Sequence, residues 1–189
     1  MKQITFKIEG TTALMQNSPK TVNPFDSFTK AIAAITAKRK RTDEDTLELF
    51  RLKWMASLYY EDGKYIIPAS HFHQAIVAAG KEKKLGSKFT RSFGIMTPSC
   101  PLKFKDSKLT PEELYKHSEY VDIRAVGIRG SKVPQARFIV PKWSTEVSCW
   151  YDESQLNEEE IIEAFNIAGL RYGIGTFRAL YGRFSADKI

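Results

Sequence analysis

YVDIRAVGIRGSKVPQARFIVPKWSTEVSCWY, residues 120–151, is the stretch that decides the fold class. Apolar residues alternate with charged ones from Val121 to Ala125, and with serine and glutamate from Trp143 to Cys149. A period of two is typical of a strand with one buried face. The intervening segment 128–137 is rich in charge and too long for a tight turn. We therefore expect the two strands to pair as a hairpin with an extended basic tip.

Working outward, spacing, capping and turn signals predict the other elements. They are a strand at 2–8, an irregular loop at 9–24, helices at 25–39, 42–58, 68–80, 110–117 and 157–168, a hairpin turning at Asp62–Gly63, and a last strand at 179–185. The basic, glycine-punctuated segment 81–94 is expected to be partly mobile. Asp26 is expected to cap the helix that follows it.

The coarse order is strand, helical insertion, strand, strand, helix, strand. This order predicts an α+β, ferredoxin-like (RRM-like) fold, in which helices cover one face of an antiparallel sheet. We expect a single domain over residues 1–189, with a core at 1–10 and 118–189 and a helical insertion at about 25–117. A basic β-hairpin would project from this core.

The charge of the chain indicates a polyanionic partner. Lysine and arginine number 29 against 22 aspartates and glutamates, which gives a net charge of +7. Such a charge favours nucleic acid, because each neutralised phosphate releases condensed counterions. A basic but merely soluble protein is the alternative. The sequence has no apolar run of membrane-spanning length, no secretory signal and two isolated cysteines, so we expect a cytoplasmic protein without a membrane partner.

The closing stretch GLRYGIGTFRALYGRF, residues 169–184, mixes glycine, arginine and aromatic residues. It is not a dinucleotide fingerprint, which needs a strand before the glycines and a helix after them. Two interpretations stay open: a tight helix-to-strand connection with glycines at positive φ, or a loop that cradles phosphates. We expect no more than one of its aromatic side chains to be exposed. The candidate phosphate contacts are Arg171, Gly173, Gly175, Arg178 and Arg183.

The expected hairpin tip supplies a second basic set. Arginine binds phosphate with two parallel hydrogen bonds, and a basic arm can order on a nucleic-acid strand. A solvated charged loop is the alternative. The candidate residues are Arg124, Arg129, Lys132 and Arg137.

Residues for catalysis or metal binding are sparse. His71 and His73 are two positions apart, which places them on different faces of a helix, where they cannot share a metal. Asp26 and His71 are the only residues that we consider for RNA cleavage. The sequence shows no catalytic triad and no metal motif, so we predict no metal, no cofactor and, on balance, no enzyme.

Three segments carry a resemblance to known proteins: IEGTTALMQNS, VNPFDSFTKAI and AGLRYGIGTFRALYGRF. Together they resemble a group of small phage proteins and, more distantly, the repeat-associated (RAMP) superfamily of CRISPR proteins, above all the backbone subunit that coats guide RNA. The resemblance spans almost the whole chain in the order of its elements, with modest motif specificity.

The resemblance implies a ferredoxin-like core that grips RNA with a glycine-rich loop and separates bases with a hairpin thumb. By position, the thumb is 128–137, the glycine-rich loop is 173–182, and the loop at 10–24 lines the same channel. Some backbone subunits cleave target RNA with an aspartate in that loop. Asp26 is the nearest match, although it falls late, next to the helix.

The sequence therefore predicts a protein that binds single-stranded nucleic acid, RNA in the first place, through its phosphates and without sequence specificity. Head-to-tail self-assembly along the strand is a further expectation. Three alternatives stay open: a phage factor that mimics or caps a host CRISPR backbone subunit through protein contacts, an RNase, and a purely structural virion component.

Overall fold

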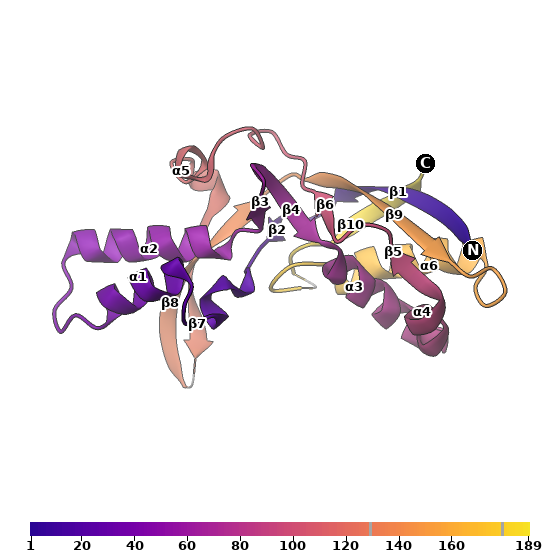
Figure 1. Ribbon diagram of the computed structural model, residues 1–189, viewed down its shortest axis with the longest axis horizontal. Helices are drawn as coiled ribbons and strands as arrows, with labels where there is room; N and C mark the ends of the chain where they lie inside the picture. Colours follow the sequence, from indigo (N-terminus) through magenta and orange to yellow (C-terminus); the bar gives the residue numbers. More distant parts are fainter. Residues whose placement is uncertain (129, 179) are drawn as a thin grey trace. The chain divides into compact units, whose positions relative to one another are not determined.

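The structure, a computed structural model, describes all residues except Arg129 and Ala179 and the side chain of Ile128. The chain forms two compact units, each built from separate segments (Figure 1). Unit 1 contains Met1–Leu14, Tyr60–Ser107 and Pro141–Ile189, and unit 2 contains Met15–Tyr59 and Lys108–Val140. The units divide the chain differently from the core and insertion that we expected, because 60–107 belongs to unit 1 and 108–140 to unit 2.

The main sheet of unit 1 is antiparallel and has the strand order β10-β1-β9-β5. Its strands are β1 (Lys2–Gly10), β5 (Phe93–Ile95), β9 (Ser144–Tyr151) and β10 (Phe184–Lys188). β1 is central, with β9 on one side and β10 on the other. Its residues Ile4, Phe6 and Ile8 are buried, as their alternation predicts. The Phe6 ring stacks on Phe165 with ring centroids 3.9 Å apart, which joins the sheet to its helices.

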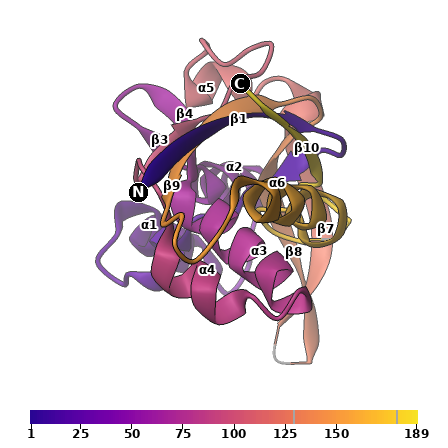
Figure 2. The ribbon, with the colours of Figure 1, turned by 90° about the vertical axis from the view of Figure 1, so that its right-hand side faces the viewer.

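Helices cover one face of this sheet (Figure 2). They are α3 (Ala69–Glu82), α4 (Gly86–Ser92), α6 (Glu158–Ile167) and the π-helical turn η3 (Ala168–Tyr172). α6 begins with a capping box, in which Asn157 and Glu160 each accept a hydrogen bond from the other's backbone N–H. The basic segment 81–94 contains all of α4. Phe89 is fully buried on the α4 turn, so one apolar anchor fixes a segment that reads as basic and polar.

A smaller sheet in unit 1 has the order β3-β4-β6. Its strands are β3 (Tyr60–Glu61), β4 (Lys64–Pro68) and β6 (Ser99–Pro101). The turn between β3 and β4 has positive φ at Asp62 (49°) and Gly63 (74°), which confirms the predicted hairpin.

Unit 2 combines a helix pair with a β-hairpin. Its elements are β2 (Leu14–Met15, at the boundary of the units), η1 (Pro19–Val22), α1 (Ser27–Thr36), α2 (Asp43–Ser57), α5 (Pro111–Leu114), η2 (Ser118–Tyr120), β7 (Val121–Ile128) and β8 (Ser131–Val140), with the strand order β2-β8-β7. α2 packs on β8 through Trp54, whose ring meets Phe138 edge-on and whose Nε1 donates to the Tyr120 carbonyl at 2.8 Å. Ser57 Oγ accepts from the Phe138 amide at 2.9 Å.

The expected pairing of the two strands in 120–151 is wrong. β7 pairs with β8, from Val121↔Phe138 to Ile128↔Ser131, and β9 belongs to the main sheet of unit 1. The segment expected to be an extended tip is therefore itself a strand. The turn includes Arg129, which lies outside the described residues. The last strand also starts later than expected, at Phe184, and Ala179 at the start of the expected strand lies outside the described residues.

The fold is therefore α+β, with several small antiparallel sheets and six α-helices in the described part of the chain. Among those helices, none is long and apolar enough to cross a membrane.

Candidate nucleic-acid interface

Two segments from opposite ends of the chain meet in unit 1, where β1 ends. The Gly182 amide donates to the Ala13 carbonyl at 2.8 Å, and the Thr11 amide donates to the Arg183 carbonyl at 2.9 Å. The Arg183 amide donates to Thr12 Oγ1, also at 2.9 Å. We call residues 10–13 and 173–183 the loop junction. These three hydrogen bonds fix the backbone path of the loop junction, although β1 and β10 do not pair within it.

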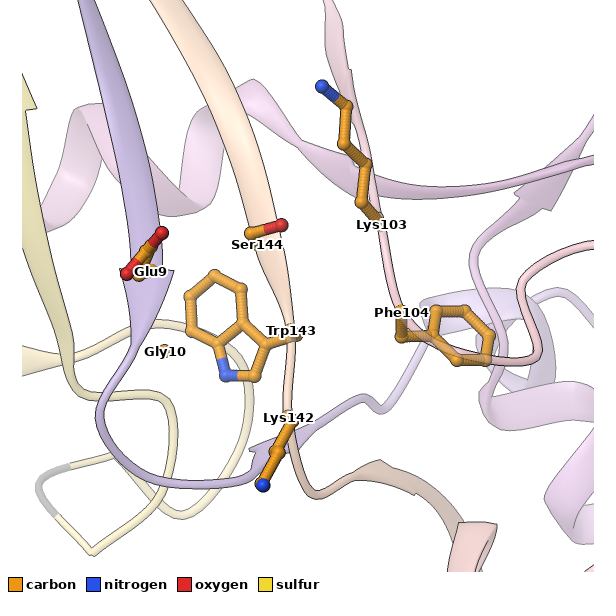
Figure 3. Close-up of a pocket in the computed structure, with 7 residues that line it drawn as sticks. All are labelled: Glu9, Gly10, Lys103, Phe104, Lys142, Trp143 and Ser144. Atoms are coloured by element: carbon orange, nitrogen blue, oxygen red, sulfur yellow. The ribbon is translucent and has the colours of Figure 1, made fainter.

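Trp143 is hydrogen-bonded to two residues of the loop junction, Gly10 and Thr12. Its Nε1 donates to the Thr12 carbonyl at 2.9 Å, and its carbonyl accepts from the Gly10 amide at 2.9 Å. A Cβ at Gly10 would lie 2.1 Å from Trp143 Nε1, so only glycine allows the indole to lie against the strand here (Figure 3).

A cavity of about 550 Å³ opens beside the Trp143 indole (Figure 3). Its lining residues are Glu9, Gly10, Lys103, Phe104, Lys142, Trp143 and Ser144. Lys103 Nζ lies 2.5 Å from a carboxylate oxygen of Glu146, so its charge is neutralised locally. Lys142 is exposed and makes no ion pair within the described part of the chain. The cavity therefore has one available cation at its rim.

The glycines of the closing stretch support its turns, as one of the two interpretations expected. Gly173 and Gly175 have φ of 63° and 81°, and Gly182 has φ of 73°. Phe177 also has positive φ, at 52°, and its side chain is 38% exposed. It is the exposed aromatic residue among the described residues of this stretch, since Phe184 is buried and the two tyrosines are half-buried. The stretch is therefore a strained corner that presents one aromatic ring.

The three arginines of the closing stretch differ in their surroundings. Arg171 forms an ion pair with Glu82, to which Tyr172 also donates. Arg178 is exposed. The Arg183 side chain is half-buried, and its buried Nε has no hydrogen-bond partner among the described residues. A buried polar group without a partner costs about 1–3 kcal/mol and a charged one more, so this position favours an added acceptor.

His71, at the start of α3, is close enough to Arg178 to respond to its charge. Burial lowers the pKa of the His71 imidazole, and the Arg178 guanidinium lowers it further. His71 is therefore neutral at pH 7, with an arginine beside it.

The exposed face of the main sheet is not a basic platform. Lys7 Nζ lies 2.6 Å from Glu9, and Lys103 is paired with Glu146 on the neighbouring strand. Thr5 and Ser148 share a hydrogen bond of 3.0 Å. Opposite charges alternate along this face, so a polyanion would gain little there.

The hairpin residues of unit 2 form a separate set. Arg124 is bound to Asp122 by two hydrogen bonds of 2.5 Å. Arg137 is half-buried, and its pKa is lowered by burial and then by the neighbouring charge of Arg124. Lys132 is exposed, and Arg129 lies outside the described residues. Of the four, only Lys132 is described as an exposed cation.

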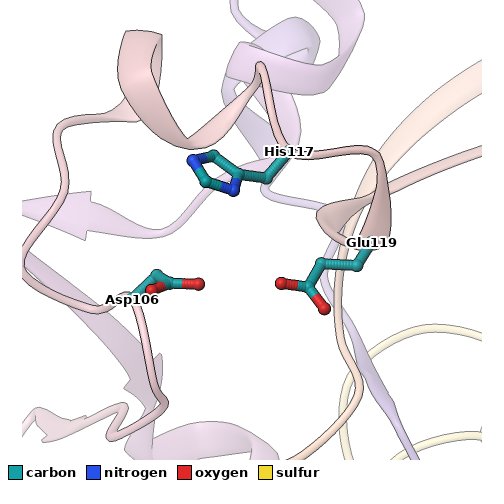
Figure 4. Close-up of side chains that lie close together, drawn as sticks. All are labelled: Asp106, His117 and Glu119. Atoms are coloured by element: carbon teal, nitrogen blue, oxygen red, sulfur yellow. The ribbon is translucent and has the colours of Figure 1, made fainter.

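The two residues considered for RNA cleavage, Asp26 and His71, belong to different units. Asp26 caps α1, accepting from the amides of Phe28 at 2.8 Å and Thr29 at 3.4 Å. His117 and Glu119 lie at the start of η2 in unit 2 (Figure 4). Asp106, drawn with them, belongs to unit 1, and no site is assigned across the two units.

Both cysteines are buried free thiols. Burial raises the pKa of Cys100 to about 11 and that of Cys149 to about 12. Both therefore stay protonated near neutral pH, and neither is a reactive nucleophile.

Sequence reasoning missed Thr12, Lys142 and Trp143 as members of the junction. Thr12 was assigned to an irregular loop, and Trp143 was counted only as part of a strand. The available signal was the pair Gly10 and Trp143, because a glycine ending one strand often marks the place where a large ring packs against it.

No protein-family model matches the chain, and no curated protein matches it either. Among 34 matching chains of solved structures is one from "Cryo-EM structure of the Type III-B Cmr-beta bound to cognate target RNA". The TM-score is 0.55 at 14% sequence identity. The similarity covers 100% of this chain but only 61% of that chain, less than two thirds of its length. At this identity the likeness concerns the fold alone.

Proposed function

We propose that this protein binds single-stranded nucleic acid, RNA in the first place, through phosphate contacts at the loop junction of unit 1. The binding would be independent of base sequence, since the junction offers guanidinium groups and an exposed aromatic ring rather than a set of side chains matched to base edges. Unit 1 would be a ferredoxin-like core, since its sheet order β10-β1-β9-β5 is the one that a β-α-β-β-α-β chain forms.

The observation that carries this proposal is the buried Arg183 Nε without a partner among the described residues. Elsewhere in unit 1 several basic side chains are already matched with acids: Lys2, Lys7, Lys83, Lys103, Arg171 and Lys188. Arg183 instead keeps a donor aimed into a buried position. A phosphate oxygen would supply the missing acceptor through a charge-assisted hydrogen bond.

Neighbouring groups would extend the contact along a strand. Arg178 and Lys142 are exposed cations that belong to the same junction or adjoin it. Phe177 presents a ring on which a base could stack, and stacking tolerates any base. Arg171 would contribute less, because binding phosphate would first require it to leave Glu82.

The structural comparison supports the same class of ligand. The matched chain comes from an assembly described as bound to target RNA, and this chain has a similar fold over its full length. We therefore propose RNA before DNA, and a CRISPR-related role as the most direct biological setting. Exposed Lys132 on the hairpin would be a second, weaker contact in unit 2.

The test is the affinity of the purified chain, stripped of nucleic acid, for a fluorescein-labelled homopolymeric RNA, measured by anisotropy over a range of salt concentrations. We expect the logarithm of the association constant to fall linearly with the logarithm of salt concentration. Arg183→Ala should weaken binding by about tenfold or more, since a hydrogen bond to a charged group contributes about 1.5–3 kcal/mol.

Lys2→Ala is the matched control. It also removes one positive charge from unit 1, but Lys2 lies at the other end of β1 from Gly10. Its affinity should stay close to that of the wild type. Equal affinities for Arg183→Ala and wild type, or a binding curve that does not respond to salt, would overturn the proposal.

A further inference from the structure

The strand β7 leaves one long edge of the unit 2 sheet open. In the order β2-β8-β7 it is the terminal strand, and among the described strands only β8 pairs with it. Its register with β8 runs without a bulge from Val121 to Ile128. An open edge presents a row of backbone N–H and C=O groups that another strand can bind.

One face of β7 is apolar and exposed. Ile123 is 50% exposed, and Ala125 and Gly127 are exposed too. Sequence alternation predicted that Val121, Ile123 and Ala125 would face a core. α2 packs on β8 where Ala136 and Phe138 are buried, but the hairpin extends beyond the helix pair (Figure 1). The apolar stripe of β7 therefore has no cover over most of its length.

The other face of β7 carries two opposite charges two residues apart. Asp122 and Arg124 flank Ile123 and bind each other through two hydrogen bonds. The segment Asp122–Ile123–Arg124 is therefore complementary in charge to a second, antiparallel copy of itself. An antiparallel partner centred on Ile123 would place an acid opposite each base.

We infer that β7 pairs with β7 of a second copy of this chain, antiparallel and centred on Ile123. Residues directly opposite share a face of the sheet. Ile123 would therefore meet the partner's Ile123, and Val121 would meet the partner's Ala125. On the other face, Asp122 would meet the partner's Arg124, and the two-fold axis repeats this contact. The two three-stranded sheets would become one continuous sheet.

Charge complementarity favours a second copy over nucleic acid as the occupant. Asp122 balances Arg124 on β7, while the half-buried Arg137 lies opposite Asp122 on β8, so the strand β7 itself contributes no net charge that would attract a polyanion. A second β7 pairs the open backbone edge, places the two apolar stripes side by side and puts each charge opposite one of the other sign. The inference is independent of the proposed function, which rests on unit 1.

Sedimentation velocity of the full chain, freed of nucleic acid by nuclease and high salt, tests this inference. The wild type should show a concentration-dependent monomer–dimer equilibrium. Asp122→Arg and Arg124→Asp should each weaken the dimer by about tenfold or more, because each puts like charges opposite one another twice.

The decisive experiment is to mix the Asp122→Arg and Arg124→Asp variants. A chain with Arg at both positions faces one with Asp at both positions, so every contact across the axis is attractive. The mixture should form heterodimers although neither variant forms homodimers. If each variant stayed monomeric only because it had lost its internal Asp122–Arg124 ion pair, mixing would not restore dimerisation.

Ile123→Lys should also give a monomer, since it places two ammonium groups on the axis. Leu47→Lys is the matched control, because Leu47 is an exposed apolar residue of unit 2 at 66% exposure on α2. It should leave the dimer intact. A wild type that stays monomeric at every concentration, single variants that dimerise like the wild type, or a mixture without heterodimers would each overturn the inference.

Discussion

At Gly182 the backbone requires a residue without a side chain. Its φ is +73°, and a Cβ there would lie 1.9 Å from the Ile174 carbonyl oxygen. The opposing atom belongs to the backbone, so no side-chain rotation can relieve the contact. The same residue donates to Ala13, so its position fixes the loop junction.

We therefore expect Gly182→Ala to destabilise unit 1 by about 3 kcal/mol or more, the sum of a left-handed backbone and an overpacked contact. Gly63→Ala is the matched control, because Gly63 has φ of +74° but nothing within 4 Å of a Cβ. It should cost only about 1–2 kcal/mol. Urea unfolding measures both, and equal costs would show that the Ile174 contact yields.

The environment of His71 predicts a pH dependence of stability. Burial and Arg178 lower the pKa of His71 in the folded protein, so the unfolded chain binds a proton more readily. Stability from this residue is thus fully present above the ordinary histidine pKa of about 6.5 and is lost as the pH falls through the folded value.

His71→Gln should accordingly reduce the loss of unfolding free energy between about pH 7 and about pH 5. His117→Gln, at an exposed histidine, controls for removing a histidine elsewhere. Urea midpoints at each pH give the comparison. Parallel pH profiles for His71→Gln and wild type would mean that His71 titrates alike in both states.

At the scale of elements, caps are the most local source of order. The Asn157–Glu160 capping box satisfies two backbone donors at the start of α6, which packs Phe165 against the main sheet. We expect Asn157→Ala to cost about 1 kcal/mol. Asn166→Ala, at an exposed position on the same helix, should be neutral or slightly stabilising because alanine has the higher helix propensity. Thermal unfolding of the two variants separates these outcomes, and equal midpoints would assign no role to the cap.

Local signals predicted the elements better than their partners. The helix starts at Thr42 and Asn157, the Asp62–Gly63 turn and the alternation of β1 were all predicted correctly, because each involves residues close in sequence. The pairing of β7 was predicted wrongly. Its partner β8 was not recognised as a strand because it contains Lys132, Pro134 and Arg137. In addition, alternation identifies a strand without identifying the strand beside it.

In the candidate site, too, local features could be predicted from the sequence and long-range contacts could not. The positive φ of Gly173 and Gly182 was one of two interpretations that the sequence allowed. The contacts of Thr12 with Trp143 and Arg183 span 131 and 171 residues, and no periodicity encodes such contacts. Solvation of Arg183 also depends on burial, which only the folded chain determines.

At the scale of the molecule, the positive charge is unequally divided. Unit 2 has 14 lysines and arginines against 9 aspartates and glutamates, a net charge of +5, and unit 1 has 15 against 13, a net charge of +2. Phosphate binding at the candidate site in unit 1 would thus depend on which cations lack an acidic partner rather than on the net charge of the unit. Unit 2 supplies most of the general attraction to polyanions.

This division predicts that nucleic acid accompanies the chain through purification at low salt. The ratio of absorbance at 260 nm to that at 280 nm should be raised at low salt and fall after a high-salt wash, as counterion release requires. A ratio typical of pure protein at every salt concentration would contradict it. Sequencing the released material distinguishes RNA from DNA.

The central position of β1 has a consequence for synthesis. Its neighbours in the sheet, β9 and β10, both lie beyond residue 143, so β1 is synthesised well before either strand that pairs with it. While the chain grows on the ribosome, Ile4, Phe6 and Ile8 remain without the surface that buries them. Such long-range closure slows folding and prolongs exposure to chaperones and proteases. Nascent chains that stop before β9 emerges cannot complete unit 1, so the burial of β1 depends on the synthesis of β9 and β10.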